Sequence, residues 1–267
     1  MAEGLRIIVC VKQVPDPEGP PSAFEVDTGR KTVTPRGIPP VISPFDENAL
    51  EAAIRLKDAH GCTVTLLSMG SRLSTAVFLK AIAVGVDESY LVEDPLLEPD
   101  RLDGYITAHL LAAAIKRTGA FDLILTGRQA ADTNAGIVGL GIAEILGIPA
   151  VTLAQGMKLE EDTLRVERVL PDGHEVVRVP LPALVTVSHE IGELRYPRIS
   201  DIKSAKGRPQ TRWNLDDICA ESLHWARVRL DDLYTPSRQS HCILVEGENP
   251  EDAGSSLAVL LRNERIL

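Results

Sequence analysis

The first 150 residues alternate short apolar runs with segments of helical periodicity, and this alternation constrains the fold more than any other feature. Apolar runs that lack polar alternation indicate strands buried on both faces of a parallel sheet. They lie at residues 5–11, 63–67, 90–92 and 121–125. Helical periodicity occupies residues 44–59, with Ser43 as N-cap and Pro44 at N1, and then residues 74–84 and 101–117. Strands that alternate with helices predict an α/β fold with a doubly wound, mostly parallel sheet.

Residues 121–150 join a buried strand, a polar loop and a helix. Small and polar residues fill 126–134, apolar residues recur at helical spacing from 135 to 146, and Gly147 ends the helix. This arrangement directs backbone N–H groups and the positive end of a helix dipole at an anion. We interpret the loop as the phosphate-binding edge of a nucleotide site, in which Arg128 and Gln129 suit phosphate or ribose contacts.

Two features of this loop have alternative explanations. Asp132 and Asn134 are also suited to capping the following helix. Gly136, Gly139 and Gly141 fall within the predicted helix, whereas a dinucleotide fingerprint places its glycines in the strand-to-helix turn. Helical glycines indicate either packing of the helix on the sheet or close approach of the backbone to a ligand.

Polar or small residues follow three of the predicted strands, at Lys12, Ser68 and Thr126. In an open parallel sheet, ligands bind outside the carboxyl ends of the strands. We therefore expect the three strand ends to converge on one ligand.

The chain after Pro149 follows a different pattern. Residues 164–169 and 175–179 alternate around an Asp-Gly turn and predict a β-hairpin, and residues 183–187 predict another buried strand. Residues 188–213 have no apolar period and hold six Lys or Arg, which indicates a long functional loop. Residues 214–267 form a mixed arm that ends in a helix over about 251–262.

Composition and spacing exclude several classes of protein. A net charge of −10 argues against nucleic-acid binding. The four cysteines show no C-x-x-C spacing, and Cys10 and Cys62 suit buried, reduced thiols of a cytoplasmic protein. We expect neither a signal peptide nor a membrane span. The scattered histidines form no catalytic constellation, so a carrier or binding module is favoured over an enzyme.

Five motifs, in order along almost the whole chain, resemble the β subunit of electron transfer flavoprotein. They begin with Val11-Lys12-Gln13-Val14-Pro15-Asp16 and Ser43-Pro44-Phe45-Asp46-Glu47-Asn48-Ala49, and continue with Gly127-Arg128-Gln129-Ala130-x-Asp132, Leu181-Pro182-Ala183-Leu184-Val185-Thr186 and Arg195-Tyr196-Pro197. The resemblance implies an adenine-nucleotide-binding type of α/β fold and a heterodimer. In such a heterodimer the α subunit holds the redox FAD, and the β subunit holds AMP or, in bifurcating members, a second FAD.

The resemblance also implies which residues bind the nucleotide. By position these are Cys10, Ser43, Pro44, Phe45, Asp46, Ser68, Met69, Gly127, Arg128, Gln129, Ala130, Asp132, Thr133, Asn134, Ala135, Gly136, Ile137 and Val138. The phosphate loop departs from both subgroups. Ala135 and Ile137 stand where bifurcating members carry Thr and Gln, and Ala135-Gly136-Ile137-Val138 replaces the Cys-Asn-Gln-Thr pattern of AMP-binding members. Contacts would then come mostly from backbone N–H groups, which do not discriminate AMP from FAD. Since the bifurcating motif is incomplete, we favour AMP.

Residues 190–208 match the loop with which the family recognises dehydrogenases. Ile199 takes the position of the apolar anchor, within a basic rim. The docking residues implied are Arg195, Tyr196, Pro197, Ile199, Lys203 and Lys206. A surface loop with a partly buried Ile199 is the simpler alternative.

We therefore expect an α/β domain over 1–213 and a C-terminal arm over 214–267 that packs on the partner subunit. The protein would carry electrons from flavin dehydrogenases of the acyl-CoA type to a quinone reductase or another acceptor, without substrate chemistry of its own. A stand-alone adenine-nucleotide-binding stress protein is the alternative. It explains the sheet and the phosphate loop but leaves the hairpin, the basic loop and the arm without a role. An ATP-using ligase would need a pyrophosphatase-type loop, which the sequence lacks.

Overall fold

The computed structural model describes residues 4–99, 102–219, 226–236 and 242–267. The chain divides into two compact units, Met1–Leu233 and Tyr234–Leu267. Among the described residues, no helix has both the length and the apolar character that crossing a membrane requires.

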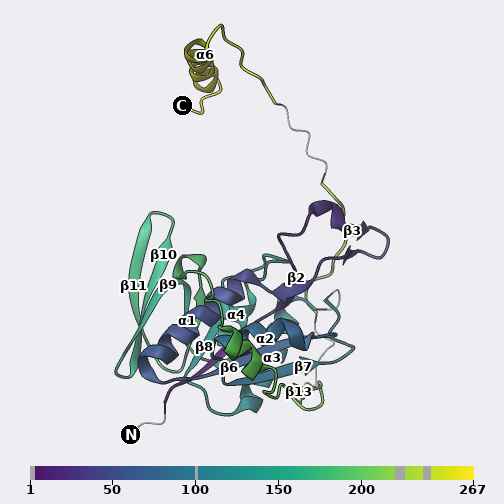
Figure 1. Ribbon diagram of the computed structural model, residues 1–267, viewed down its shortest axis with the longest axis vertical. Helices are drawn as coiled ribbons and strands as arrows, with labels where there is room; N and C mark the ends of the chain where they lie inside the picture. Colours follow the sequence, from purple (N-terminus) through teal and green to yellow (C-terminus); the bar gives the residue numbers. More distant parts are fainter. Residues whose placement is uncertain (1–3, 100–101, 220–225, 237–241) are drawn as a thin grey trace. The chain divides into compact units, whose positions relative to one another are not determined.

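A nine-stranded sheet organises the first unit (Figure 1). In spatial order its strands are β11 (Gly173–Pro180), β10 (Thr163–Leu170), β9 (Ala150–Glu160), β12 (Ala183–Val187), β8 (Leu123–Gly127), β1 (Arg6–Cys10), β6 (Thr63–Gly70), β7 (Glu88–Glu93) and β13 (Thr211–Trp213). From β9 to β13 all neighbours are parallel, whereas β9, β10 and β11 pair antiparallel. The mostly parallel α/β sheet predicted from the sequence is thus confirmed.

Helices cover both faces of this sheet. They are α1 (Pro44–His60), α2 (Thr75–Val84), α3 (Gly104–Thr118) and α4 (Val138–Leu146), and the short α5 (Ile199–Ala205) packs on α2. In β1, Ile7 and Val9 join the core cluster that includes α1, while Ile8 and Cys10 join the cluster that includes α3 and α4. The continuous apolar run of β1 is therefore explained, because successive side chains point to opposite and equally buried faces.

Smaller elements complete the first unit. A short hairpin consists of β3 (Phe24–Asp27) and β4 (Thr32–Pro35), and the 3-10 helix η1 (Pro21–Ala23) precedes it. A second small sheet joins β2 (Gln13–Pro15) to β5 (Pro40–Ile42), and the 3-10 helix η3 (His189–Ile191) follows β12.

The structure corrects three sequence-based expectations. Helix α4 begins at Val138 rather than at residue 135, because Asn134 and Gly136 have left-handed φ angles of 52° and 66° that a helix cannot contain. The hairpin predicted over residues 164–179 is part of a three-stranded antiparallel extension of the sheet, since β9 also pairs with β10. The segment 188–213 is not wholly irregular, because it contains α5 and β13.

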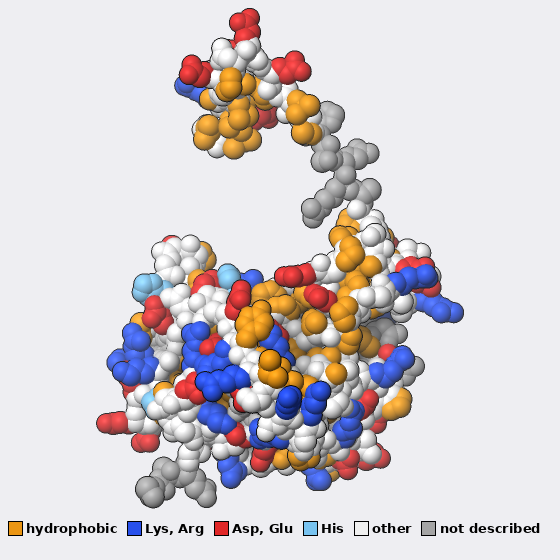
Figure 2. All heavy atoms as spheres, viewed as in Figure 1, with side chains coloured by type: hydrophobic (Ala, Val, Ile, Leu, Met, Phe, Trp, Pro, Cys, Tyr) orange, Lys and Arg blue, Asp and Glu red, His pale blue; other side chains and the backbone are white. Residues whose placement is uncertain are grey.

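The second unit consists of a tail and α6 (Pro250–Asn263), close to the predicted helix. Asn249 caps it by accepting a hydrogen bond from the Asp252 N–H at 2.9 Å. Leu257, Val259 and Leu260 are exposed on it, and Figure 2 shows hydrophobic side chains gathered on this unit. Leu215 and Ile218 are buried in the first unit, so the compact part extends beyond the predicted boundary at 213. Packing of the arm on a partner subunit stays a prediction.

The helical glycines of α4 serve close packing. A Cβ on Gly139 would lie 2.7 Å from Thr126 Oγ1 and 3.1 Å from Thr186 Cγ2, and one on Gly141 would lie 2.8 Å from the Ala108 Cβ on α3. Both distances to the nearest atom are shorter than a normal van der Waals contact. Helix-on-sheet and helix-on-helix packing thus explains these two glycines.

We predict that Gly139→Ala lowers the free energy of unfolding by about 1–3 kcal/mol, because α4 must move away from β8 and β12. Urea denaturation of the purified protein measures this change. Glu144→Ala, at an exposed position of the same helix, is the control and should change stability little. Equal stability of the two variants would contradict the packing role of Gly139.

Candidate nucleotide site and docking loop

The predicted convergence of strand ends is present in the structure. Because β1 lies between β6 and β8 in parallel register, Cys10 pairs with Leu67 on one side and with Thr126 on the other. Lys12, Ser68 and Gly127 therefore follow at the same edge of the sheet. The first turn of α1 reaches this edge through Asp46.

Asp46 ties the ends of β1 and β8 together. Its buried carboxylate accepts a hydrogen bond from the Lys12 N–H at 2.8 Å and another from the Gly127 N–H at 3.0 Å. Burial raises the pKa of Asp46 to about 7, although these two N–H donors and the Lys12 charge act in the opposite direction. The residue thus links three segments and titrates near neutral pH.

Two further contacts hold the polar loop against this edge. Lys12 Nζ lies 2.6 Å from Asp132 Oδ2. The Ala131 N–H donates to Ser43 Oγ at 3.3 Å. Ser43 is the N-cap residue of α1 by position. Its hydroxyl does not cap the helix and instead accepts the hydrogen bond from the loop. The contact connects two segments that are 88 residues apart in the chain.

The N-terminus of α4 has no side-chain cap. Its N-cap residue is Ile137, whose side chain has no hydrogen-bond acceptor. Asn134 Oδ1 accepts from Gln129 Nε2 at 2.8 Å, and Asp132 pairs with Lys12. The alternative that Asp132 or Asn134 caps this helix is therefore wrong. The first N–H groups of an α-helix have no intrahelical partner, so those of α4 suit an anion.

Other predicted residues border this region. Arg128 lies over the Phe45 ring at 4.8 Å, and its Nε atom has no hydrogen-bond partner among the described residues. The buried Ser68 Oγ likewise has no described partner. Exposed residues continue around the loop, at Asp132, Thr133, Asn134, Ala135, Gly136 and Ile137. Unpartnered polar atoms beside an uncapped helix fit a bound nucleotide, and the binding roles of the individual residues stay predictions.

Cys10 is buried and forms no disulfide. Burial, and then the nearby Asp46 carboxylate, raise the pKa of this thiol far above its ordinary value. The thiol is protonated at neutral pH and is therefore a packing group rather than a nucleophile. Among the described residues, no cluster of three His, Cys, Asp or Glu could hold a metal ion.

The predicted docking loop contains exposed and anchored residues. Tyr196 and Ile199 are 87% and 75% exposed, and Lys203 and Lys206 are also exposed. The alternative of a partly buried Ile199 is therefore wrong. Arg195 differs from these residues, because its guanidinium is held by carboxylates of α1. Its docking role stays a prediction, but its described contacts are internal.

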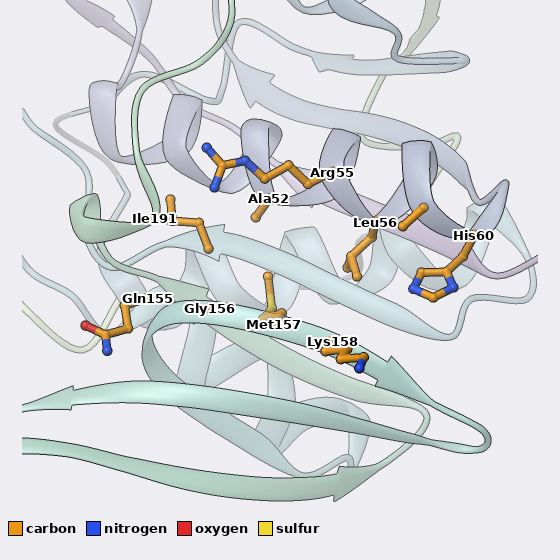
Figure 3. A pocket seen from close by; sticks show the side chains of 10 residues that line it. Ala52, Arg55, Leu56, His60, Gln155, Gly156, Met157, Lys158 and Ile191 are labelled. Carbon is orange, nitrogen blue, oxygen red and sulfur yellow. The ribbon is translucent and has the colours of Figure 1, made fainter.

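The cavity in Figure 3 lies between α1 and β9, at the base of the antiparallel extension. Its volume is about 380 Å³, and its lining includes Leu56, Met157 and Ile191. It contains none of the predicted nucleotide-binding residues. The sequence did not indicate this cavity, since β9 was not predicted.

Comparisons with known proteins identify relatives over nearly the whole chain. Residues 32–218 match the electron transfer flavoprotein domain family. The chain is 33% identical, over 98% of its length and 100% of the relative, to the caffeyl-CoA reductase-Etf complex subunit CarD of Acetobacterium woodii. It is 38% identical, over 80% of each chain, to the electron transfer flavoprotein subunit beta of Clostridium acetobutylicum. It is 31% identical, over 98% of its length and 100% of the relative, to the acryloyl-CoA reductase electron transfer subunit gamma of Anaerotignum propionicum.

We predict that the stability contribution of Asp46 depends on pH. Its pKa is about 7 in the folded protein and 3.8 ordinarily, so the folded state binds this proton more tightly. Its contribution is then present below about pH 4 and is lost as the pH rises to about 7. Between pH 5 and pH 8 the wild type should lose roughly 2–3 kcal/mol relative to Asp46→Asn, as measured by chemical denaturation.

The matched control is Asp172→Asn, in the exposed turn between β10 and β11. Its stability should follow that of the wild type at every pH. If the curves of Asp46→Asn and the wild type also run parallel, Asp46 does not titrate as described.

Proposed function

This chain belongs to the electron transfer flavoprotein family as a β-type subunit, and we propose that it forms a heterodimer with an α subunit. We also propose that it holds AMP at the edge of the sheet where β1, β6 and β8 end, called here the strand-end edge. FAD, bound mainly by the α subunit, would supply the one-electron and two-electron chemistry. This chain would hold the nucleotide, help to enclose the flavin and dock a dehydrogenase. The uncapped N-terminus of α4 at the ends of β1 and β8 is the observation that carries the nucleotide site.

Several contacts support a phosphate at this edge. The loop is held in place by the Lys12–Asp132 ion pair and by the hydrogen bond from the Ala131 N–H to Ser43. The unpartnered Arg128 Nε adds hydrogen-bonding capacity within the loop itself. A loop fixed in advance loses little conformational freedom when it binds a phosphate.

The incomplete bifurcating motif supports AMP over a second FAD. Ala135 and Ile137 replace the Thr and Gln of bifurcating members and offer no side-chain hydrogen bond. A second FAD, as in bifurcating members of the family, is the other candidate for the same site.

The names of two relatives support an acyl-CoA type of partner. One is named as a subunit of a caffeyl-CoA reductase-Etf complex and another as an electron transfer subunit of acryloyl-CoA reductase, so both names include a reductase of a coenzyme A thioester. We propose that electrons pass from a flavin dehydrogenase of this type to a quinone reductase or another acceptor. The exposed Tyr196 and Ile199, with Pro197 between them and Lys203 and Lys206 nearby, would form the docking surface.

The nucleotide content of the heterodimer tests the AMP assignment. We expect that co-expression with the α subunit gives a yellow heterodimer that releases one FAD and one AMP on denaturation. Chromatography of the released nucleotides measures both. Two FAD without AMP would contradict the AMP assignment, and a colourless homodimer would favour the stand-alone stress protein.

The docking role of Ile199 has its own test. We predict that Ile199→Ala slows electron transfer from a medium-chain acyl-CoA dehydrogenase, reduced by its acyl-CoA substrate, by about tenfold, because an apolar anchor is lost. Stopped-flow reduction of the heterodimer measures the rate, and flavin content should not change. Val176→Ala removes an exposed aliphatic side chain from β11 and is the control. Equal rates in the two variants would remove the anchor role.

A further inference from the structure

Glu51 is a buried charge that the proposed nucleotide site does not use. It lies on α1, and its side chain is only 5% exposed. Carboxylates are seldom buried to this degree unless they are paired and hydrogen-bonded. Its partners therefore indicate its purpose.

Arg195 supplies most of these partners. Glu51 Oε2 accepts from the Arg195 backbone N–H at 3.1 Å and from its Nε at 3.1 Å, and Oε1 accepts from a terminal guanidinium nitrogen at 3.0 Å. Arg55, one turn further along α1, donates to Oε1 at 2.9 Å. One carboxylate thus holds both the main chain and the side chain of Arg195, although the two residues are 144 positions apart.

Asp58, also on α1, is a further partner of the Arg195 guanidinium. It accepts from the other terminal guanidinium nitrogen at 2.6 Å. Burial alone would raise the pKa of Glu51, but its hydrogen bonds to Arg195 and Arg55 outweigh burial, and the pKa lies below its ordinary value. Both partners are therefore charged at neutral pH, and a forked arginine–carboxylate pair fixes orientation as well as distance.

The chain just before Arg195 is also attached to α1. Asn48 Nδ2 donates to the Gly192 carbonyl at 2.7 Å. Gly192 has a φ of 107°, and a Cβ there would lie 3.0 Å from an Arg55 guanidinium nitrogen. Ile191 is buried, and Figure 3 shows its side chain between α1 and β9. Directly after Arg195 the chain becomes exposed at Tyr196.

We propose that Glu51 is a positioning residue that fixes the base of the docking loop through Arg195. Its carboxylate fixes the direction in which the chain continues from Arg195, away from the surface of α1, so that Tyr196 and Ile199 are held in one orientation. A loop ordered in advance binds its partner more tightly than one that must be ordered on binding. This inference rests on the proposed docking function of the loop.

Glu51→Gln in the heterodimer tests the proposal. The amide keeps the size of the side chain but loses the charge and one acceptor for the guanidinium. We expect faster backbone hydrogen exchange over residues 193–205. We also expect an increase of about tenfold in the KM for the reduced medium-chain acyl-CoA dehydrogenase, with kcat and nucleotide content unchanged.

The matched control is Glu160→Gln, which breaks another carboxylate–arginine pair, with Arg178 at 2.9 Å on the antiparallel extension. Glu160→Gln should change neither the hydrogen exchange over 193–205 nor the KM. Arg195→Lys keeps the positive charge but loses the forked guanidinium, and it should show smaller increases in the exchange rate and in the KM. If Glu51→Gln does not fold, Arg195→Lys alone provides both measurements.

Two results distinguish a failure of the positioning role of Glu51 from a failure of the docking function. Hydrogen exchange over 193–205 that matches the Glu160→Gln control would overturn the role of Glu51, whatever the kinetics. Faster exchange in Glu51→Gln without a change in KM, together with wild-type kinetics for Ile199→Ala, would support the positioning role of Glu51 and overturn the docking role of the loop.

Discussion

The buried Asp46 carboxylate is the interaction on which the candidate site depends. From the first turn of α1 it accepts the backbone N–H of Lys12, just beyond β1, and that of Gly127, the last residue of β8. Buried backbone N–H groups need a hydrogen-bond partner, and the carboxylate supplies one for each of these two groups. Ser43, three residues earlier, then holds the polar loop that precedes α4. One helix start thus sets the geometry of three loops.

Close packing of glycine supports the same arrangement. A Cβ on Gly127 would lie 2.6 Å from Asp46 Oδ1 and 2.6 Å from the carbonyl carbon of Phe45. Only glycine allows α1 to approach the end of β8 closely enough for this hydrogen bond. The position therefore connects local backbone geometry with the assembly of the candidate site.

The sequence predicted the features that local patterns encode. The apolar runs of β1, β6 and β8 are buried on both faces, and α1 carries recognisable start and stop residues, so the strand-end edge could be located in advance. Strand β9 escaped prediction because its pairing with β10 and β12, and not an alternating pattern, holds it in the sheet. Helix α5 spans only seven residues and packs against α2 through Ile202 and Ala205. Such short helices depend on tertiary contacts more than on their own sequence.

The pairing of Glu51 with Arg195 could not be predicted for a different reason. Each residue alone has an ordinary environment in the sequence, and a charged residue on a helix normally indicates a solvated face. Only the fold brings the two together across 144 positions. The start of α4 was misplaced because apolar spacing continues through residues whose φ angles are left-handed.

Helix α1 carries both Asp46 and Glu51, and this imposes a constraint on chain length. Each residue of an α-helix rotates about 100° around the axis and rises about 1.5 Å. An insertion or deletion of one residue between them would turn Glu51 away from Arg195 while Asp46 stayed in place. The β10–β11 turn, which is exposed, carries no such constraint. Related chains should therefore vary in length at that turn and keep the five-residue spacing between these two acids.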